Sequence, residues 1–162
     1  NEYFPFIHNS DLNHYDKIFI SRADSIGKRP ILNLSDFESL MDKFSFRSLT
    51  VSKLSLTERL YLFQNVKVLI GVFSAGFANI VFCRRCKLII FIDHPLYGLP
   101  FEYAEFCKFR GINIIRIRVS ILIKIFHFLL NLFSKSSHNT NNNKGWYLNL
   151  TKISRKLSKI EF

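Results

Sequence analysis

The residues best suited to chemistry lie in the stretch 67–82, KVLIGVFSAGFANIVF. Its first half is a short run of apolar and β-branched residues, which is typical of a buried strand. Gly71 is expected to end that strand, and Ser74 is expected to cap a helix that follows it. The first N–H groups and the positive end of such a helix attract anions such as phosphate. The same residues also suit an ordinary tight turn, so on their own they leave both interpretations open.

A second candidate loop spans residues 22–33 and follows a predicted strand, KIFIS. It begins with Arg22, contains Arg29 and ends at Asn33, and either Asn33 or Ser35 is expected to cap the next helix. Ligands of parallel sheets bind outside the carboxyl ends of the strands. We therefore expect the loops 22–33 and 71–74 to meet at one edge of a sheet.

Apolar patterning places these loops in an α/β fold with strands and helices in alternation. The predicted strands are 17–21, 46–51, 66–70, 87–92 and 113–118, and the predicted helices are 33–43, 55–65, 74–82, 100–110 and 151–160. Ser55 and Glu58 form a capping box at the start of the second helix. Such alternation predicts a Rossmann-like parallel sheet with helices on both faces.

The expected organisation has three parts. Residues 1–16 are interpreted as the remnant of an upstream domain or a linker, residues 17–119 as the Rossmann-like domain, and residues 120–162 as an apolar helix, an Asn-rich loop and a basic terminal helix. Because the first residue is Asn1 rather than Met, the chain is expected to be a fragment.

Composition indicates a globular protein with an anionic partner. The chain has 162 residues, 48% of them hydrophobic, and a formal net charge of +11. This length suffices for one domain with a full core, and this charge favours a nucleotide, a phospholipid or a nucleic acid as partner. The sequence has no RNA-binding or helix-turn-helix signature, which disfavours nucleic acid.

Few other residues suggest a reactive site. Cys83 and Cys86 form a C-x-x-C, but neither a second pair nor a histidine cluster completes a zinc set, so they and Cys107 are expected to be buried thiols. Asp93 and His94 follow a predicted strand, where turn chemistry is favoured over an acid–base pair.

Three segments together resemble the carboxyl-terminal half of family 61 glycosyltransferases. They are KIFISRADSIGKRPILN at 17–33, LSLTERLYLFQNVKVLIGVFSAGFANIVF at 54–82 and FCKFRGINIIRI at 106–117. The family includes plant xylosyltransferases, animal protein O-GlcNAc transferases and bacterial capsular-polysaccharide enzymes. The resemblance implies a GT-B fold whose carboxyl-terminal domain binds a nucleotide sugar, commonly UDP-linked. It also implies transfer with inversion, with no metal and no cofactor besides the donor itself.

The resemblance also implies a binding site, though it assigns no catalytic residue. Two arginines, an asparagine and a G-x-H-G-A-x-x-x-N-like motif of the family have counterparts here. With the glycine of the predicted turn, the nucleotide-sugar site comprises Arg22, Arg29, Asn33, Gly71, Ser74, Ala75 and Asn79. Without a metal, guanidinium groups and helix N–H groups must meet the charge that develops on the leaving diphosphate.

The chain departs from the family pattern at three positions. Phe73 replaces the histidine of the motif, Ser74 replaces a glycine, and Phe91 stands where relatives often carry a glutamate. Two hypotheses follow. The chain is the donor-binding part of a transferase that acts on a glycan or protein acceptor, or it is a truncated or degenerate, catalytically inactive relative that serves as a binding module.

Residues 120–135 form a strongly apolar segment with one polar stripe. The stripe consists of Ser120, Lys124, His127, Asn131 and Lys135. A helix over 121–133 reaches only about 20 Å, which is too short to cross a bilayer core. Both a core helix and a helix lying in a membrane interface fit this pattern, and the second would make 120–135 a peripheral membrane contact.

Overall fold

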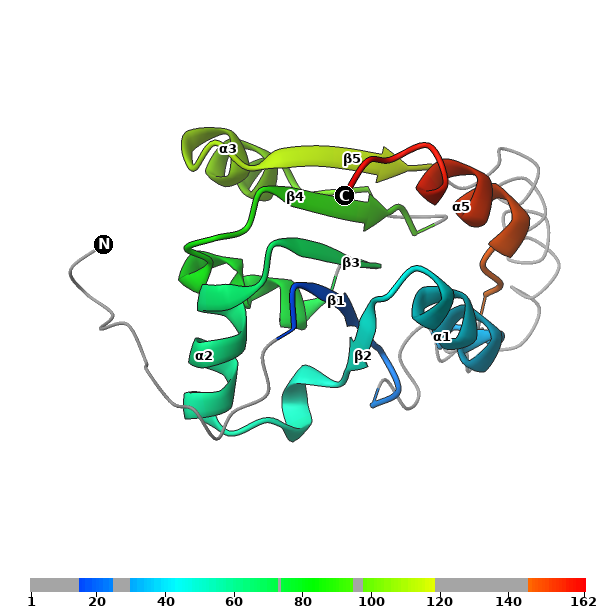
Figure 1. Ribbon diagram of the computed structural model, residues 1–162, viewed down its shortest axis with the longest axis horizontal. Helices are drawn as coiled ribbons and strands as arrows, with labels where there is room; N and C mark the ends of the chain where they lie inside the picture. The colour runs from blue at the N-terminus through cyan, green and yellow to red at the C-terminus, as the bar shows by residue number, and fades with distance from the viewer. Residues whose placement is uncertain (1–14, 25–29, 73, 95–97, 119–145) are drawn as a thin grey trace, which may run out of the picture.

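The computed structural model describes residues 15–24, 30–72, 74–94, 98–118 and 146–162. Its centre is one five-stranded parallel sheet with the order β2-β1-β3-β4-β5 (Figure 1). The strands are β1 Lys17–Ile20, β2 Arg47–Leu49, β3 Val68–Val72, β4 Leu88–Ile92 and β5 Asn113–Ile117. This sheet confirms the predicted α/β, Rossmann-like class.

Helices cover both faces of the sheet. Side chains that alternate along each strand are therefore buried on opposite sides of the sheet. On one face lie α1 (Leu34–Lys43) and α5 (Leu150–Leu157), which pack with Phe19, Ile70 and Ile90. On the other lie α2 (Leu56–Asn65), the 3-10 helix η2 (Ala75–Phe82) and α3 (Phe101–Phe109), which pack with Ile18, Leu69 and Ile89. All five residues of β3 are buried, as expected for a central parallel strand.

Strand β3 does not end at Gly71, so that expectation was wrong. The strand continues to Val72, and Gly71 pairs with Ile20 of β1 and Phe91 of β4. The requirement for glycine at this position is steric. A Cβ on Gly71 would lie 3.0 Å from the Phe77 ring and 3.2 Å from the Ile20 carbonyl oxygen. Glycine is therefore used inside the strand to let η2 approach the sheet.

The helix predicted after Ser74 is a 3-10 helix rather than an α-helix. Ser74 occupies its N-cap position, but its side chain makes no capping hydrogen bond. The prediction that the Ser74 side chain caps this helix is therefore wrong. The Phe77 N–H bonds instead to the Ser74 carbonyl at 2.9 Å. Gly76 packs so closely on Ile20 that a Cβ there would lie 2.9 Å from Ile20 Cγ2, which indicates that tight packing on β1 shapes this segment.

One other strand differs in detail. The strand predicted over 46–51 covers only Arg47–Leu49, and a 3-10 turn, η1, follows at Val51–Lys53. The capping box of α2 is confirmed, because the Glu58 N–H donates to Ser55 Oγ and the Ser55 N–H donates to the Glu58 carboxylate. Hydrogen bonding of the Glu58 carboxylate with the Ser55 side chain and with the Ser55 backbone N–H lowers the pKa of Glu58.

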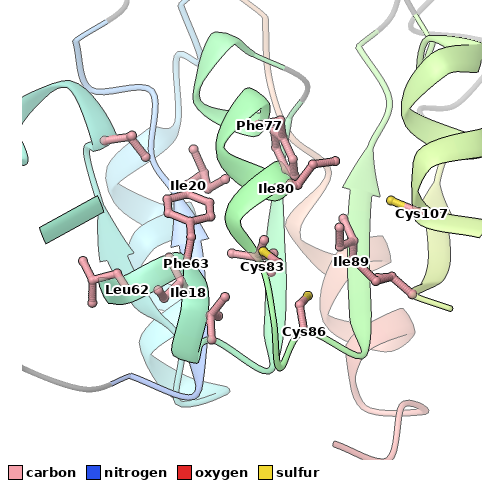
Figure 2. Close-up of a cluster of buried hydrophobic side chains, with 14 of the residues drawn as sticks. Ile18, Ile20, Leu62, Phe63, Phe77, Ile80, Cys83, Cys86, Ile89 and Cys107 are labelled. Carbon is pink, nitrogen blue, oxygen red and sulfur yellow. The ribbon is translucent and has the colours of Figure 1, made fainter. Parts of the chain in front are cut away.

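The three cysteines are buried free thiols, as predicted (Figure 2). A hydrogen bond with Cys86 raises the pKa of the Cys83 thiol. Burial raises the pKa of the Cys107 thiol to about 11. Within the described ranges, no three His, Cys, Asp or Glu side chains are grouped to hold a metal. These thiols are part of the core under η2 and α3.

We predict that Gly71→Ala destabilises the fold, because the added Cβ collides with the Phe77 ring and with backbone. The expected loss is about 1–3 kcal/mol in the free energy of unfolding, measured by urea denaturation. Ala78→Ser adds one atom at an exposed site of η2 and is expected to change stability by less than about 0.5 kcal/mol. Equal stability of the two variants would contradict this account of Gly71.

Candidate functional site

The two candidate loops leave the same edge of the sheet. Strand β1 lies between β2 and β3, and the chain leaves β1 toward α1 on one face but leaves β3 toward η2 on the other. In a sheet of order 2-1-3-4-5, this divergence at the carboxyl ends of β1 and β3 is the topological switch point, where such folds bind ligands. The topology therefore has both loops leave the carboxyl edge of the sheet.

Arg22 lies at this edge, two residues beyond the end of β1, with only 8% of its surface exposed. The backbone before it is fixed at Ser21, whose N–H donates to the Leu49 carbonyl at 2.9 Å and whose hydroxyl donates to Glu38 at 2.6 Å. The Ala23 N–H in turn donates to the Ser21 hydroxyl. A planar guanidinium held from such a turn suits bidentate recognition of phosphate.

Ser74 and Ala75 also lie at this edge, where η2 begins. Ser74 has an extended backbone and is partly buried, while Ala75 is exposed. The first N–H groups of a helix have no partner within the helix, and those of η2 start two residues after β3 ends. Gly71 lies within β3 beneath the Phe77 ring, so its visible role is packing.

Asn33 contacts another part of the chain. Its side chain does not cap α1, which corrects the capping expectation, although it occupies the N-cap position. Its Nδ2 donates to the Leu148 carbonyl at 2.9 Å, and its Oδ1 accepts from the Leu148 N–H at 2.8 Å. Both polar atoms of this amide thus bind the carboxyl-terminal segment, 115 residues away in sequence.

Asn79 makes a local bond. Its Nδ2 donates to the Gly76 carbonyl at 2.9 Å, so the side chain bonds within η2. Arg29 and Phe73 lie outside the described residues, as does the segment 120–135. Of the predicted site residues that the structure describes, Arg22, Ser74 and Ala75 lie just beyond the carboxyl ends of β1 and β3.

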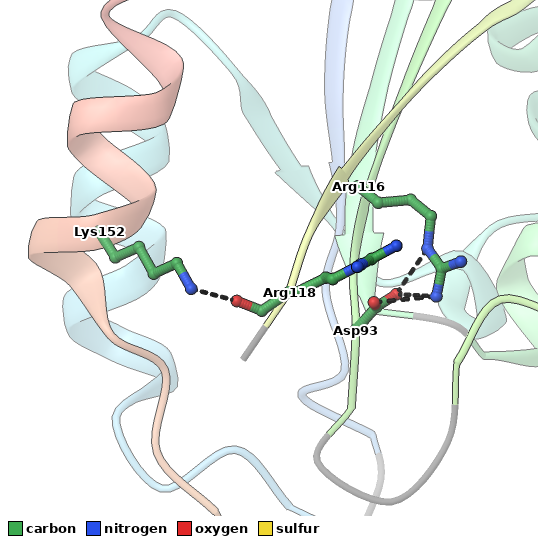
Figure 3. Close-up of polar contacts among 4 residues, drawn as sticks. All are labelled: Asp93, Arg116, Arg118 and Lys152. Carbon is green, nitrogen blue, oxygen red and sulfur yellow. Dashed lines mark hydrogen bonds and ion pairs between the residues drawn. The ribbon is translucent and has the colours of Figure 1, made fainter. Parts of the chain in front are cut away.

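Sequence reasoning missed an ion pair at the same edge, between the ends of β4 and β5. Three hydrogen bonds from the Arg116 guanidinium reach the Asp93 carboxylate, the shortest from Nη2 to Oδ2 at 2.9 Å (Figure 3). Beside it, Lys152 of α5 donates to the Arg118 carbonyl. Asp93 therefore pairs with an arginine of the neighbouring strand. This contact could be predicted only if the register of β4 and β5 were known.

The carboxyl-terminal segment brings an aromatic residue to this edge. Trp146 forms a parallel bridge with Ile31: its N–H donates to the Pro30 carbonyl at 3.0 Å, and its carbonyl accepts from the Leu32 N–H at 2.9 Å. Its indole ring meets the His94 ring edge-on, with 4.9 Å between centroids. The segment before α5 is thus paired with the loop that follows β1.

A groove of about 520 Å³ lies elsewhere, between α1 and α5. It is lined by Asp36, Ser39, Leu40, Lys43, Leu150, Thr151, Ser154 and Arg155. Predicted site residues do not line it, and it opens over the helices rather than at the switch point. The described part of the chain contains no helix long and apolar enough to cross a membrane.

One family model matches this chain. Its description is Glycosyltransferase 61, and it matches residues 3–90, which include β1, β2, β3 and η2. No curated protein and no solved structure matches the chain. The family resemblance drawn from the motifs is thereby confirmed, while Asp93, Arg116 and Trp146 lie beyond the matched residues.

We predict that Asn33→Ala destabilises the protein more than Asn79→Ala. Removing the Asn33 amide leaves two polar groups of the buried Leu148 backbone without their partners, at an expected cost of about 1–3 kcal/mol in urea unfolding. Asn79→Ala removes one local bond within η2 and is expected to cost less than about 1 kcal/mol. The opposite order would show that Asn33 does not hold the carboxyl-terminal segment in place.

Proposed function

This chain belongs to glycosyltransferase family 61, and from that membership we propose that it binds a UDP-linked sugar at the carboxyl ends of β1 and β3. The family supports a glycosyltransferase function in general. Within it, we assign this chain to the donor-binding half of a GT-B enzyme that transfers the sugar with inversion to a glycan or protein acceptor. The observation that supports the location most strongly is the switch point itself, with Arg22 on one loop and the start of η2 on the other.

The proposed chemistry is electrostatic. Cleavage of the bond between sugar and diphosphate leaves negative charge on the leaving oxygen, and donors already in place at that point lower the barrier. Arg22 would bind phosphate oxygens with its guanidinium fork, and the first N–H groups of η2 would add neutral donors from the other side. Because the Ser21 hydrogen bonds fix the turn before Arg22, little ordering of the backbone would be needed on binding.

A specific observation favours the alternative, an inactive binding module. Phe91, at the place where relatives often carry a glutamate, is 1% exposed and packs against the Phe77 ring with 4.6 Å between centroids. It faces the core between the sheet and η2. A carboxylate contact with a sugar or ribose hydroxyl would therefore be absent from this position. Both hypotheses predict nucleotide binding, and only transfer activity separates them.

We predict that Arg22→Ala weakens UDP binding by about 1.5–3 kcal/mol, the range for a hydrogen bond to a charged group, as measured by isothermal titration calorimetry. Arg22→Lys keeps the charge but loses the fork, so an intermediate loss is expected. Arg84→Ala removes the same charge between η2 and β4, at the opposite edge of the sheet, and is expected to leave the affinity unchanged.

Circular dichroism of each variant checks that the fold is intact, since Arg22 is buried. A folded Arg22→Ala protein with unchanged UDP affinity would remove Arg22 from the site. Loss of affinity in Arg84→Ala of the same size would show that net charge alone attracts the nucleotide.

We also propose that residues 120–135 contact a membrane peripherally. The described chain supports the electrostatic part of this proposal, because α5 buries Ile153 and Leu157 in the core and leaves Arg155 and Lys156 exposed. With a net charge of +11, attraction to anionic lipid is expected.

In liposome flotation, the chain is predicted to float with anionic vesicles and less with neutral ones, and deletion of 121–133 is predicted to abolish flotation while the sheet stays folded. If the deletion instead unfolds the sheet, the segment belongs to the core.

A further inference from the structure

The indole N–H of Trp146 has no acceptor among the residues that the structure describes. Trp146 is 2% exposed, so bulk water does not supply the missing acceptor. An indole N–H is a donor only, and leaving such a group buried without a partner costs about 1–3 kcal/mol. Buried polar groups of this kind are rare in folded proteins and call for an explanation.

The position of this donor is well defined by backbone contacts. The Trp146 backbone makes hydrogen bonds with Pro30 and Leu32, in the loop that follows β1. The Leu148 backbone makes two hydrogen bonds with the Asn33 side chain. On its other side the indole ring meets His94, two residues beyond the end of β4. Since β3 lies between β1 and β4 in the sheet, the indole is at the carboxyl edge, close to the switch point.

The surroundings of the indole differ from those of Arg22. Trp146 belongs to an apolar cluster that includes Ile31, Val72 and Ile92, all near the carboxyl ends of their strands or in the loop after β1. The guanidinium of Arg22, by contrast, suits the charged diphosphate. A neutral donor in an apolar setting suits a neutral acceptor, because such a pair carries no cost for burying a net charge.

We propose that the Trp146 indole N–H donates to a neutral oxygen of the donor's nucleoside, so that Trp146 lies at the nucleoside end of the site. This inference rests on the proposed function and extends it to a part of the chain outside the family match. Because the N–H has no contact with bulk solvent, nucleoside binding at this position requires the side chains around it to shift.

The chain contains a single tryptophan, which makes the test direct. In ¹H–¹⁵N spectra, the one indole resonance is expected to move downfield when uridine or UDP is added, as an N–H does when it gains an acceptor. Trp146→Phe is expected to weaken uridine and UDP binding by the same factor, about three- to tenfold. The matched control, Tyr147→Phe, changes an exposed neighbour and is expected to bind both ligands normally.

The outcomes separate this inference from the proposed function. If Trp146→Phe binds uridine and UDP as tightly as the unchanged chain, or if it loses affinity only for UDP, the nucleoside assignment is wrong while nucleotide binding stands. If the unchanged chain binds no nucleotide, the proposed function fails and the assignment fails with it. Should Trp146→Phe not fold, the indole resonance of the unchanged chain decides, because a resonance that stays still during saturation with UDP overturns the assignment.

Discussion

The parallel pairing of β1 with β3 is the constraint on which the rest of this structure depends. It brings Ile20 opposite Gly71 and leaves β2 and β4 on the outer sides of the pair. Side chains of both strands are buried on both faces, so the pairing sets the positions of both helix layers. The connection after β1 runs to one face of the sheet, and the connection after β3 runs to the other face. Arg22 and the start of η2 therefore lie at the same edge of the sheet, although they are far apart in sequence.

The same edge is where this apolar sheet accepts buried polar groups. Among the described residues the buried polar or charged side chains are Ser21, Arg22, Gln64, Asn65, Asp93 and His94. Four of these follow the carboxyl ends of β1 and β4, and Ser21 and Asp93 have their hydrogen bonds supplied by Glu38 and Arg116. Burial of polar groups is costly unless they are paired, so the buried polar groups of this sheet gather at an edge where hydrogen-bond partners are within reach.

Much of the fold could be predicted because its signals are local. Buried strands, the Ser55–Glu58 capping box and the alternation of strand and helix depend on residues close in sequence, and the structure contains all of them. The errors arose where a distant contact overrides a local rule. Strand β3 continues through Gly71 because its pairing with the neighbouring strands extends that far, and η2 is a 3-10 helix where Gly76 packs on β1.

The contacts at this edge that could not be predicted from the sequence are all long-range. Asn33 binds Leu148 instead of capping α1, and Asp93 finds Arg116 only through the register of β4 and β5. Trp146 reaches the edge because its backbone pairs with Ile31. None of these pairs has a signature in local composition, whereas Arg22 and Ser74 are proposed from the sequence because they follow predicted strands and match the family motif.

Chemical-shift mapping of the backbone amides during a UDP titration tests the central claim most directly. If the nucleotide binds at the switch point, the largest changes are expected at Ser21, Arg22, Ser74 and Ala75, on loops that share only this edge of the sheet. Changes confined to the groove between α1 and α5, or to Arg84 and Arg85 at the opposite edge, would contradict a donor site between β1 and β3.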